Sequence, residues 1–167
     1  MVRISGTSKN LTLPAADEMA FGVVVAEAHG EITGILLEGA MRTLKEAGCL
    51  EHNIQIKSVP NLMSLPMATQ FFAEYTDVDA VILLGCHLST EGNNPLMGPI
   101  AQNVLQIQMQ WNMPCAWGVV EAVERGAAFE QSDRGVLAAA EAIRMVRMQI
   151  DMEAASPNAN PDRRSLN

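Results

Sequence analysis

Short apolar runs alternate with longer amphipathic segments along this chain, and this alternation constrains the fold more than any other feature of the sequence. The runs at residues 21–26 (FGVVVA), 80–84 (AVILL) and 115–120 (CAWGVV) have the length and apolar character of strands buried on both faces of a parallel sheet. Residues 54–59 (IQIKSV) alternate apolar and polar side chains and precede Pro60, which is typical of a strand nearer the sheet edge. The pattern therefore predicts four strands.

Amphipathic segments follow each of these runs. Residues 32–47 carry one apolar face, and Gly48 follows the last turn, where a left-handed cap residue is common. Further helices are expected at three places, namely 66–75, opened by Pro66, then 96–111, and finally a segment capped by Ser132 or Asp133 that reaches Ile150. Strands that alternate with helices imply right-handed crossovers, so we expect an α/β domain with a four-stranded parallel sheet.

The chain has 167 residues, which is the usual size of one domain. We place that domain at 20–152, after an N-terminal extension at 1–19 and before a disordered tail at 153–167 that lacks apolar periodicity. No apolar run reaches the roughly 18 residues needed to span a bilayer, so we expect a cytoplasmic protein. Three cysteines without metal-ligand spacing suit reduced thiols and predict no metal site.

Charge and apolar content bear on the partners of this protein. The chain has 11 Lys and Arg against 19 Asp and Glu, a net charge of −8, and its basic residues do not cluster apart from Arg163 and Arg164. This charge disfavours nucleic acid as a partner. An apolar content of 49% is high for a monomer of this size, which favours a homo-oligomer.

In an open parallel sheet, ligands bind beyond the carboxyl ends of the strands, where the strand order reverses. His29 and His87 fall just past the ends of two expected strands, and a histidine placed there can transfer protons. The alternative is ordinary loop polarity. The stretch from Ser89 to Asn94 offers hydroxyls and a glycine suited to binding an anion, although it matches no phosphate-loop motif, and such a stretch is more often an ordinary polar loop.

Two further residues could contact a ligand. Arg134 stands at the start of the last helix, where the positive end of the helix dipole favours an anion, but it can also be an exposed arginine beside a capped helix. Trp117 can stack on a planar ligand or pack in the core.

Several short motifs, in this order and spacing, resemble the lumazine synthase family over about residues 20–150. They are FGVVVAE at 21–27, IT at 32–33, LEGA at 37–40, VP at 59–60, LP at 65–66, LG at 84–85, ER at 124–125 and DRG at 133–135. The resemblance implies a flavodoxin-like three-layer sandwich that assembles into a pentamer or a larger shell with sites between subunits, and that uses no cofactor.

The resemblance also implies a reaction. The family condenses a ribitylamino-pyrimidinedione with a four-carbon dihydroxybutanone phosphate to give 6,7-dimethyl-8-ribityllumazine, the precursor of riboflavin. This condensation requires an anion site, a proton shuttle and a stacking surface.

The family's functional positions fall here on changed residue types. Ala28 and His29 replace an aromatic residue and Asn, and Ser64 replaces a carboxylate. Asn94 takes the place of the catalytic histidine, for which His87 can substitute. The implied site consists of His29 and His87 as catalytic groups, Arg125 and Arg134 as phosphate ligands, and, as substrate contacts, Ala28, Asn61, Leu62, Met63, Ser64, Ser89, Thr90, Glu91, Asn94 and Trp117.

Two functions therefore stand side by side. The first is an enzyme of the lumazine synthase type, acting on the family's substrates or on related ones. The second is a non-catalytic homologue that serves as an oligomeric scaffold or ligand binder, because the stacking ring, the carboxylate and the histidine are all replaced.

Overall fold

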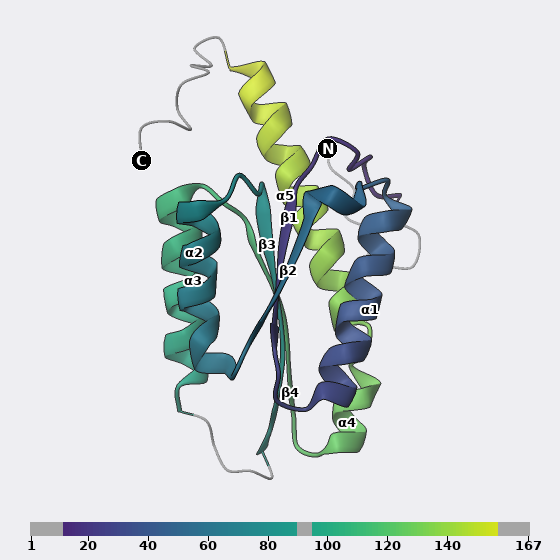
Figure 1. Ribbon diagram of the computed structural model, residues 1–167, viewed down its shortest axis with the longest axis vertical. Coiled ribbons are helices and arrows are strands. Elements are labelled where there is room, and N and C mark those ends of the chain that lie inside the picture. Colours follow the sequence, from purple (N-terminus) through teal and green to yellow (C-terminus); the bar gives the residue numbers. More distant parts are fainter. Residues whose placement is uncertain (1–11, 90–94, 157–167) are drawn as a thin grey trace, which may run out of the picture.

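The computed structural model describes residues 12–89 and 95–156 (Figure 1). Its strands and helices follow one another along the chain as β1 (Phe21–Ala26), α1 (Gly30–Glu46), η2 (Glu51–Asn53), β2 (Ile54–Val59), η3 (Leu62–Ser64), α2 (Leu65–Tyr75), β3 (Ala80–Leu88), α3 (Met97–Trp111), β4 (Cys115–Ala122), α4 (Arg125–Glu130) and α5 (Arg134–Ala155). Among the described residues, no helix is long and apolar enough to cross a membrane.

The four strands form one parallel sheet in the order β2-β1-β3-β4, which confirms the predicted α/β sandwich. Helices α1, α4 and α5 cover one face of the sheet, and α2 and α3 cover the other (Figure 1). Strands β1 and β3 are buried along nearly their whole length because helices cover both of their faces, as their continuous apolar runs predict. Strand β2 is an exposed edge strand, as its alternating sequence indicates.

Each face of the sheet has its own apolar core, and side chains alternate between the two along each strand. The core under α1 and α5 includes Ile82 and Leu84 of β3, whereas the core under α2 and α3 includes Val81 and Leu83. Helices α1 and α5 approach each other closely at Gly135, where an added Cβ atom would lie 2.0 Å from the carbonyl oxygen of Leu36. This contact requires a glycine at position 135.

Several element boundaries differ from the prediction. Strand β3 runs to Leu88 instead of ending near Leu84, because residues 85–88 pair with β4. His87 therefore lies inside a strand and not in the loop after it, which corrects the prediction. Helix α4 was not predicted, since six residues give too little periodicity to detect.

Two segments placed outside the domain by their sequence contain ordered structure. Before β1, Ala16 and Met19 are buried, and the Ala16 N–H donates to the Ala47 carbonyl at 2.8 Å, so this part of the extension packs into the main core. Helix α5 continues to Ala155, three residues beyond the expected domain end. The rest of the expected tail, 157–167, lies outside the described residues.

Candidate active site

The carboxyl ends of all four strands lie at one edge of the sheet, the lower edge in Figure 1. After β1 the chain adds β2 on one side, and after β2 it crosses over to add β3 on the other side of β1. The strand order therefore reverses between β1 and β3, which is where open α/β sheets bind ligands. The topology brings residues 27–29, 60–61, 89 and 123–124 to this edge, as the sequence predicts.

His29 lies at this edge on the α1 side. It is the N-cap residue of α1 and has a left-handed backbone, with φ 58° and ψ 51°. Its carbonyl accepts hydrogen bonds from the N–H groups of Ile32 at 2.8 Å and Thr33 at 3.1 Å, which fixes the first turn of the helix. This conformation is uncommon for residues other than glycine, while asparagine adopts it with less strain.

Arg125 is the first residue of α4 and lies on the same side of the sheet. Its Nη2 atom lies 2.8 Å from Oε2 of Glu31, which stands in the first turn of α1. The two side chains are 58% and 65% exposed, so the pair faces solvent. Arg134, the first residue of α5, is also exposed. Asp133 precedes it but makes no side-chain capping hydrogen bond, unlike the predicted cap.

The other side of the edge is formed by η3 at the start of α2. Leu62 is buried against β3, where a Cβ atom on Gly85 would come within 2.5 Å of its Cδ2 atom. The missing side chain at Gly85 thus lets η3 press onto the sheet. Ser64 donates from Oγ to Oδ1 of Asn61 at 3.3 Å, and Met63 is exposed. All four residues predicted for this segment lie together at the edge.

His87 projects beyond the end of β1, because pairing between β1 and β3 stops at Val25 and Leu84. It is half-buried and lies on the α2 and α3 face, two residues along β3 from Gly85. Its register partner on β4 is Glu121, which is exposed and lies on the same face. The structure therefore places the two predicted histidines at one edge but on opposite sides of the sheet.

Three carboxylates at this edge were not identified as site candidates from the sequence. They are Glu27, whose Oε1 accepts a hydrogen bond from Ser58 Oγ at 2.8 Å, Glu31 and Glu121. Glu27 and Glu31 each lie two residues from His29, which the strand-end rule had selected. Glu121 gives a weaker signal, since it is a charged residue at the end of an apolar run.

The remaining predicted residues are spread more widely. Ala28 and Ser89 are exposed at the edge. Thr90, Glu91 and Asn94 lie outside the described residues. Trp117 lies five residues before the end of β4 and packs against the core under α2 and α3, about 16 Å along the strand from the edge. The structure thus does not bring Trp117 together with the other candidates.

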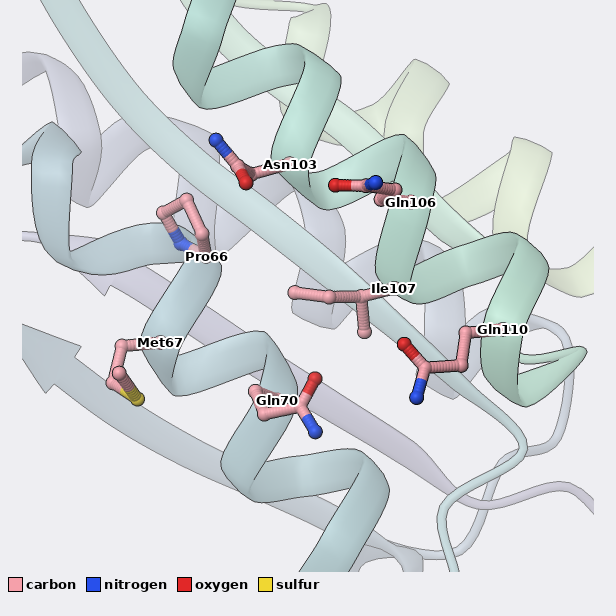
Figure 2. A pocket seen from close by; sticks show the side chains of 7 residues that line it. All are labelled: Pro66, Met67, Gln70, Asn103, Gln106, Ile107 and Gln110. Carbon is pink, nitrogen blue, oxygen red and sulfur yellow. The ribbon is translucent and has the colours of Figure 1, made fainter. Parts of the chain in front are cut away.

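Two hollows lie elsewhere on the surface. A groove of about 360 Å³ runs between α2 and α3 and is lined by Pro66, Met67, Gln70, Asn103, Gln106, Ile107 and Gln110 (Figure 2). A second hollow, also about 360 Å³, lies at the opposite edge of the sheet, near Ala20, Gln55 and Tyr75. The first groove is lined by side chains of two helices, and the second hollow lies at the other edge of the sheet. Neither hollow therefore includes the carboxyl ends of the strands.

The three cysteines are buried, and none is part of a disulfide. Burial raises the pKa of Cys115 to about 12. Burial, together with the carboxylate of Asp79, also raises the pKa of Cys49. Both thiols are therefore poor nucleophiles at neutral pH. Within the described residues, no three His, Cys, Asp or Glu side chains lie close enough together to hold a metal ion.

Comparison with known proteins identifies the family of this chain. Residues 18–149 match the family model of 6,7-dimethyl-8-ribityllumazine synthase. The chain is 35% identical over 138 residues to the 6,7-dimethyl-8-ribityllumazine synthase of Bacteroides fragilis, covering 77% of this chain and 94% of that protein. It is 33% identical to the enzyme of that name from Parabacteroides distasonis, covering 81% and 89% of the two chains. It is 30% identical to that of Cytophaga hutchinsonii, covering 88% and 100%. The chain therefore belongs to the 6,7-dimethyl-8-ribityllumazine synthase family.

Proposed function

We propose that this protein is a transferase of the riboflavin pathway that condenses a ribitylamino-pyrimidinedione with a four-carbon sugar phosphate. The observation that carries the proposal is the edge between β1 and β3, where His29 follows β1, His87 lies in the last residues of β3 and Arg125 follows β4, in a chain of this family. The relatives are all described as synthases, which favours a transferase over the non-catalytic alternative.

Arg125 and Arg134 are the proposed phosphate ligands. In this reaction the carbon–oxygen bond to the phosphate breaks, and the phosphate leaves as an anion. An arginine stabilises that anion with paired N–H donors, more strongly than a neutral side chain. Arg125 begins the helix that follows β4 and Arg134 begins α5, and both side chains are exposed, which is compatible with this role.

His29 and His87 are the proposed proton carriers. Imine formation between the amine of the pyrimidine and the carbonyl of the sugar releases water, and ring closure releases a second water, so protons must be moved to and from oxygen and carbon. Histidine suits such transfers near neutral pH. His87 lies beyond the end of β1 and stands on the side where η3 forms the wall.

The proposed contacts to the pyrimidine and ribityl groups are Ala28, Ser89 and the segment of Asn61, Leu62, Met63 and Ser64 at η3. Thr90, Glu91 and Asn94 are also proposed as contacts, on the basis of the sequence alone. Asn61 and Ser64 supply an amide and a hydroxyl, which suit the polar atoms of the pyrimidine and the hydroxyls of the ribityl chain. Trp117 supports the core beneath α2 and α3 and has no contact role in this arrangement.

The outer face of α2 and α3 supports a homo-oligomer, for which we propose a pentamer or larger shell. Helix α3 has no charged residue, yet it exposes Leu105 and Met109, and α2 exposes Met67 and Phe71. Surfaces that lack charge and are rich in Met and aromatic residues are typical of subunit interfaces. The amides in the groove of Figure 2 can hydrogen-bond across such an interface. We place the assembly in the cytoplasm.

Incubation with both family substrates tests the proposed function. Formation of 6,7-dimethyl-8-ribityllumazine, followed by its absorbance and by mass spectrometry, should require the protein and both substrates. Reactions that lack the protein correct for spontaneous condensation. A rate equal to the spontaneous rate at high protein concentration would contradict the proposal.

A further inference from the structure

The ion pair of Glu31 and Arg125 joins the starts of α1 and α4, which follow two strands that are not neighbours. Glu31 follows β1 and Arg125 follows β4, while β3 lies between these strands in the sheet. The Oε2 atom of Glu31 and the Nη2 atom of Arg125 are 2.8 Å apart. The pair therefore fixes the guanidinium at the strand-end edge, toward the segment that carries His29.

This pair uses the same donors that a phosphate would use. A carboxylate and a phosphate both accept hydrogen bonds from the N–H groups of a guanidinium. Glu31 and an incoming phosphate therefore compete for Arg125. The carboxylate also repels the negative charge of any anion that binds beside it.

Exposure of the pair makes such an exchange feasible. Because the two side chains are 58% and 65% exposed, water screens their attraction, and pairs of this kind add little to folding stability. A phosphate dianion carries twice the charge of the carboxylate and can displace it. A monoanion lacks this advantage.

Other negative charges near the pair add to the repulsion between Glu31 and an incoming anion. The chain neighbours of the two arginines include Glu124 and Asp133, which are both exposed, and the whole chain carries a net charge of −8. Glu31 contacts Arg125 directly, with 2.8 Å between Oε2 and Nη2. Removing its charge frees the guanidinium from this pair and makes the edge less negative.

We propose that Glu31 is a positioning and selectivity residue. It holds Arg125 at the strand ends while the site is empty, and it yields to a phosphate dianion but not to a carboxylate or another monoanion. This inference rests on the proposed role of Arg125 in phosphate binding and adds the residue that opposes it.

Binding of inorganic phosphate, measured by titration calorimetry on the assembled protein, tests the inference. Glu31→Gln should bind phosphate about two- to fivefold more tightly than the unaltered protein. It should also gain affinity for acetate, so that the preference for the dianion falls. Glu46→Gln is the matched control, because Glu46 is exposed at the other end of α1, about 22 Å along the helix.

A double-mutant cycle separates this role from a merely structural one. In an Arg125→Gln background, Glu31→Gln should leave phosphate affinity unchanged, because the competition acts through Arg125. The urea midpoint of Glu31→Gln should stay at that of the unaltered protein. The KM for the sugar phosphate should fall with the dissociation constant of phosphate.

Three results would overturn the inference, and each bears differently on the proposed function. If phosphate binds through Arg125 but Glu31→Gln changes nothing, the inference fails while the proposed phosphate site stands. If Glu31→Gln tightens binding equally without Arg125, the effect is general charge and the inference also fails. If neither protein binds phosphate and Arg125→Gln has no effect on turnover, the phosphate role of Arg125 fails as well.

Discussion

The two helical layers of this protein differ in how they meet solvent. Helix α5 has charged residues along its length, including the Arg147 and Asp151 pair at 3.6 Å, and it packs on α1 through a contact that only glycine permits. Helix α3 has no charged residue, and α2 has only Glu74. The outer surface of the α1 and α5 layer thus mixes charged residues with exposed methionines, whereas that of the α2 and α3 layer is nearly free of charge and is the face proposed for the subunit interface. Two helical layers that both contain many apolar residues therefore differ in how much charge their outer surfaces carry.

The largest expected effect concerns the contact between α1 and α5. Gly135→Ala should lower the free energy of unfolding by about 3 kcal/mol or more, because its Cβ atom would lie 2.0 Å from backbone oxygen, which cannot rotate away. Gly34→Ala on α1 is the control. Its Cβ atom meets nothing within 4 Å, so it should raise stability by about 0.5–1 kcal/mol. Urea unfolding at one protein concentration measures both, and equal effects would refute the close contact.

The next effect tests the outer surfaces. Met67 on α2 and Met148 on α5 are both 57% exposed, which makes Met67→Lys and Met148→Lys a matched pair. Met67→Lys should weaken assembly by about 2 kcal/mol or more, because an unpaired charge would enter an apolar interface, and Met148→Lys should leave it intact. Sedimentation velocity measures the assembly. Loss of assembly in both variants, or in neither, would remove the distinction between the layers.

An effect confined to alkaline pH arises at Cys115 in the core under α2 and α3. Burial raises its pKa from 9.0 to about 12, so the folded state keeps a proton that the unfolded state loses above pH 9. Stability should therefore be unaffected below pH 9 and should fall by about 1.4 kcal/mol per pH unit between pH 9 and 12. Cys115→Ala should show a shallower fall over this range in urea unfolding. An identical slope in the variant would contradict the burial of this thiol.

The smallest effect concerns the loop after β1. His29→Asn should raise the free energy of unfolding by about 0.5 kcal/mol, because asparagine tolerates the left-handed backbone better. It should also lower turnover if His29 carries protons. His52→Asn, at an exposed position in η2, should change neither quantity. A lower free energy of unfolding in His29→Asn would show that the contacts of the His29 side chain outweigh the strain of its left-handed backbone.

Much of the fold could be predicted because apolar residues recur at regular spacings where a strand or helix is buried. Residues 21–26 and 54–59 match the observed strands β1 and β2, since one run is covered on both faces and the other is an edge. Strand β3 was predicted too short, because Gly85 and His87 resemble loop residues. Their strand conformation depends on pairing with β4, which no local pattern reveals.

The candidate site was only partly predictable for the same reason. The rule for strand ends located His29 from the order of elements alone, whereas Arg125 became a candidate only through the family resemblance. The pairing of Arg125 with Glu31 depends on how α1 and α4 lie at the edge, and the two residues are far apart in the sequence. The distance of Trp117 from the edge also depends on where β4 ends. The predicted strand ended at residue 120, whereas β4 reaches Ala122.

Turnover of the two family substrates by the unaltered protein and by Arg125→Gln, at equal concentration and with spontaneous condensation subtracted, tests the central claim most directly. The account predicts that the unaltered protein forms 6,7-dimethyl-8-ribityllumazine and that Arg125→Gln forms it at least tenfold more slowly, since a charged hydrogen bond to the leaving phosphate is lost. No product above the spontaneous rate from the unaltered protein, or equal rates from both proteins, would contradict it.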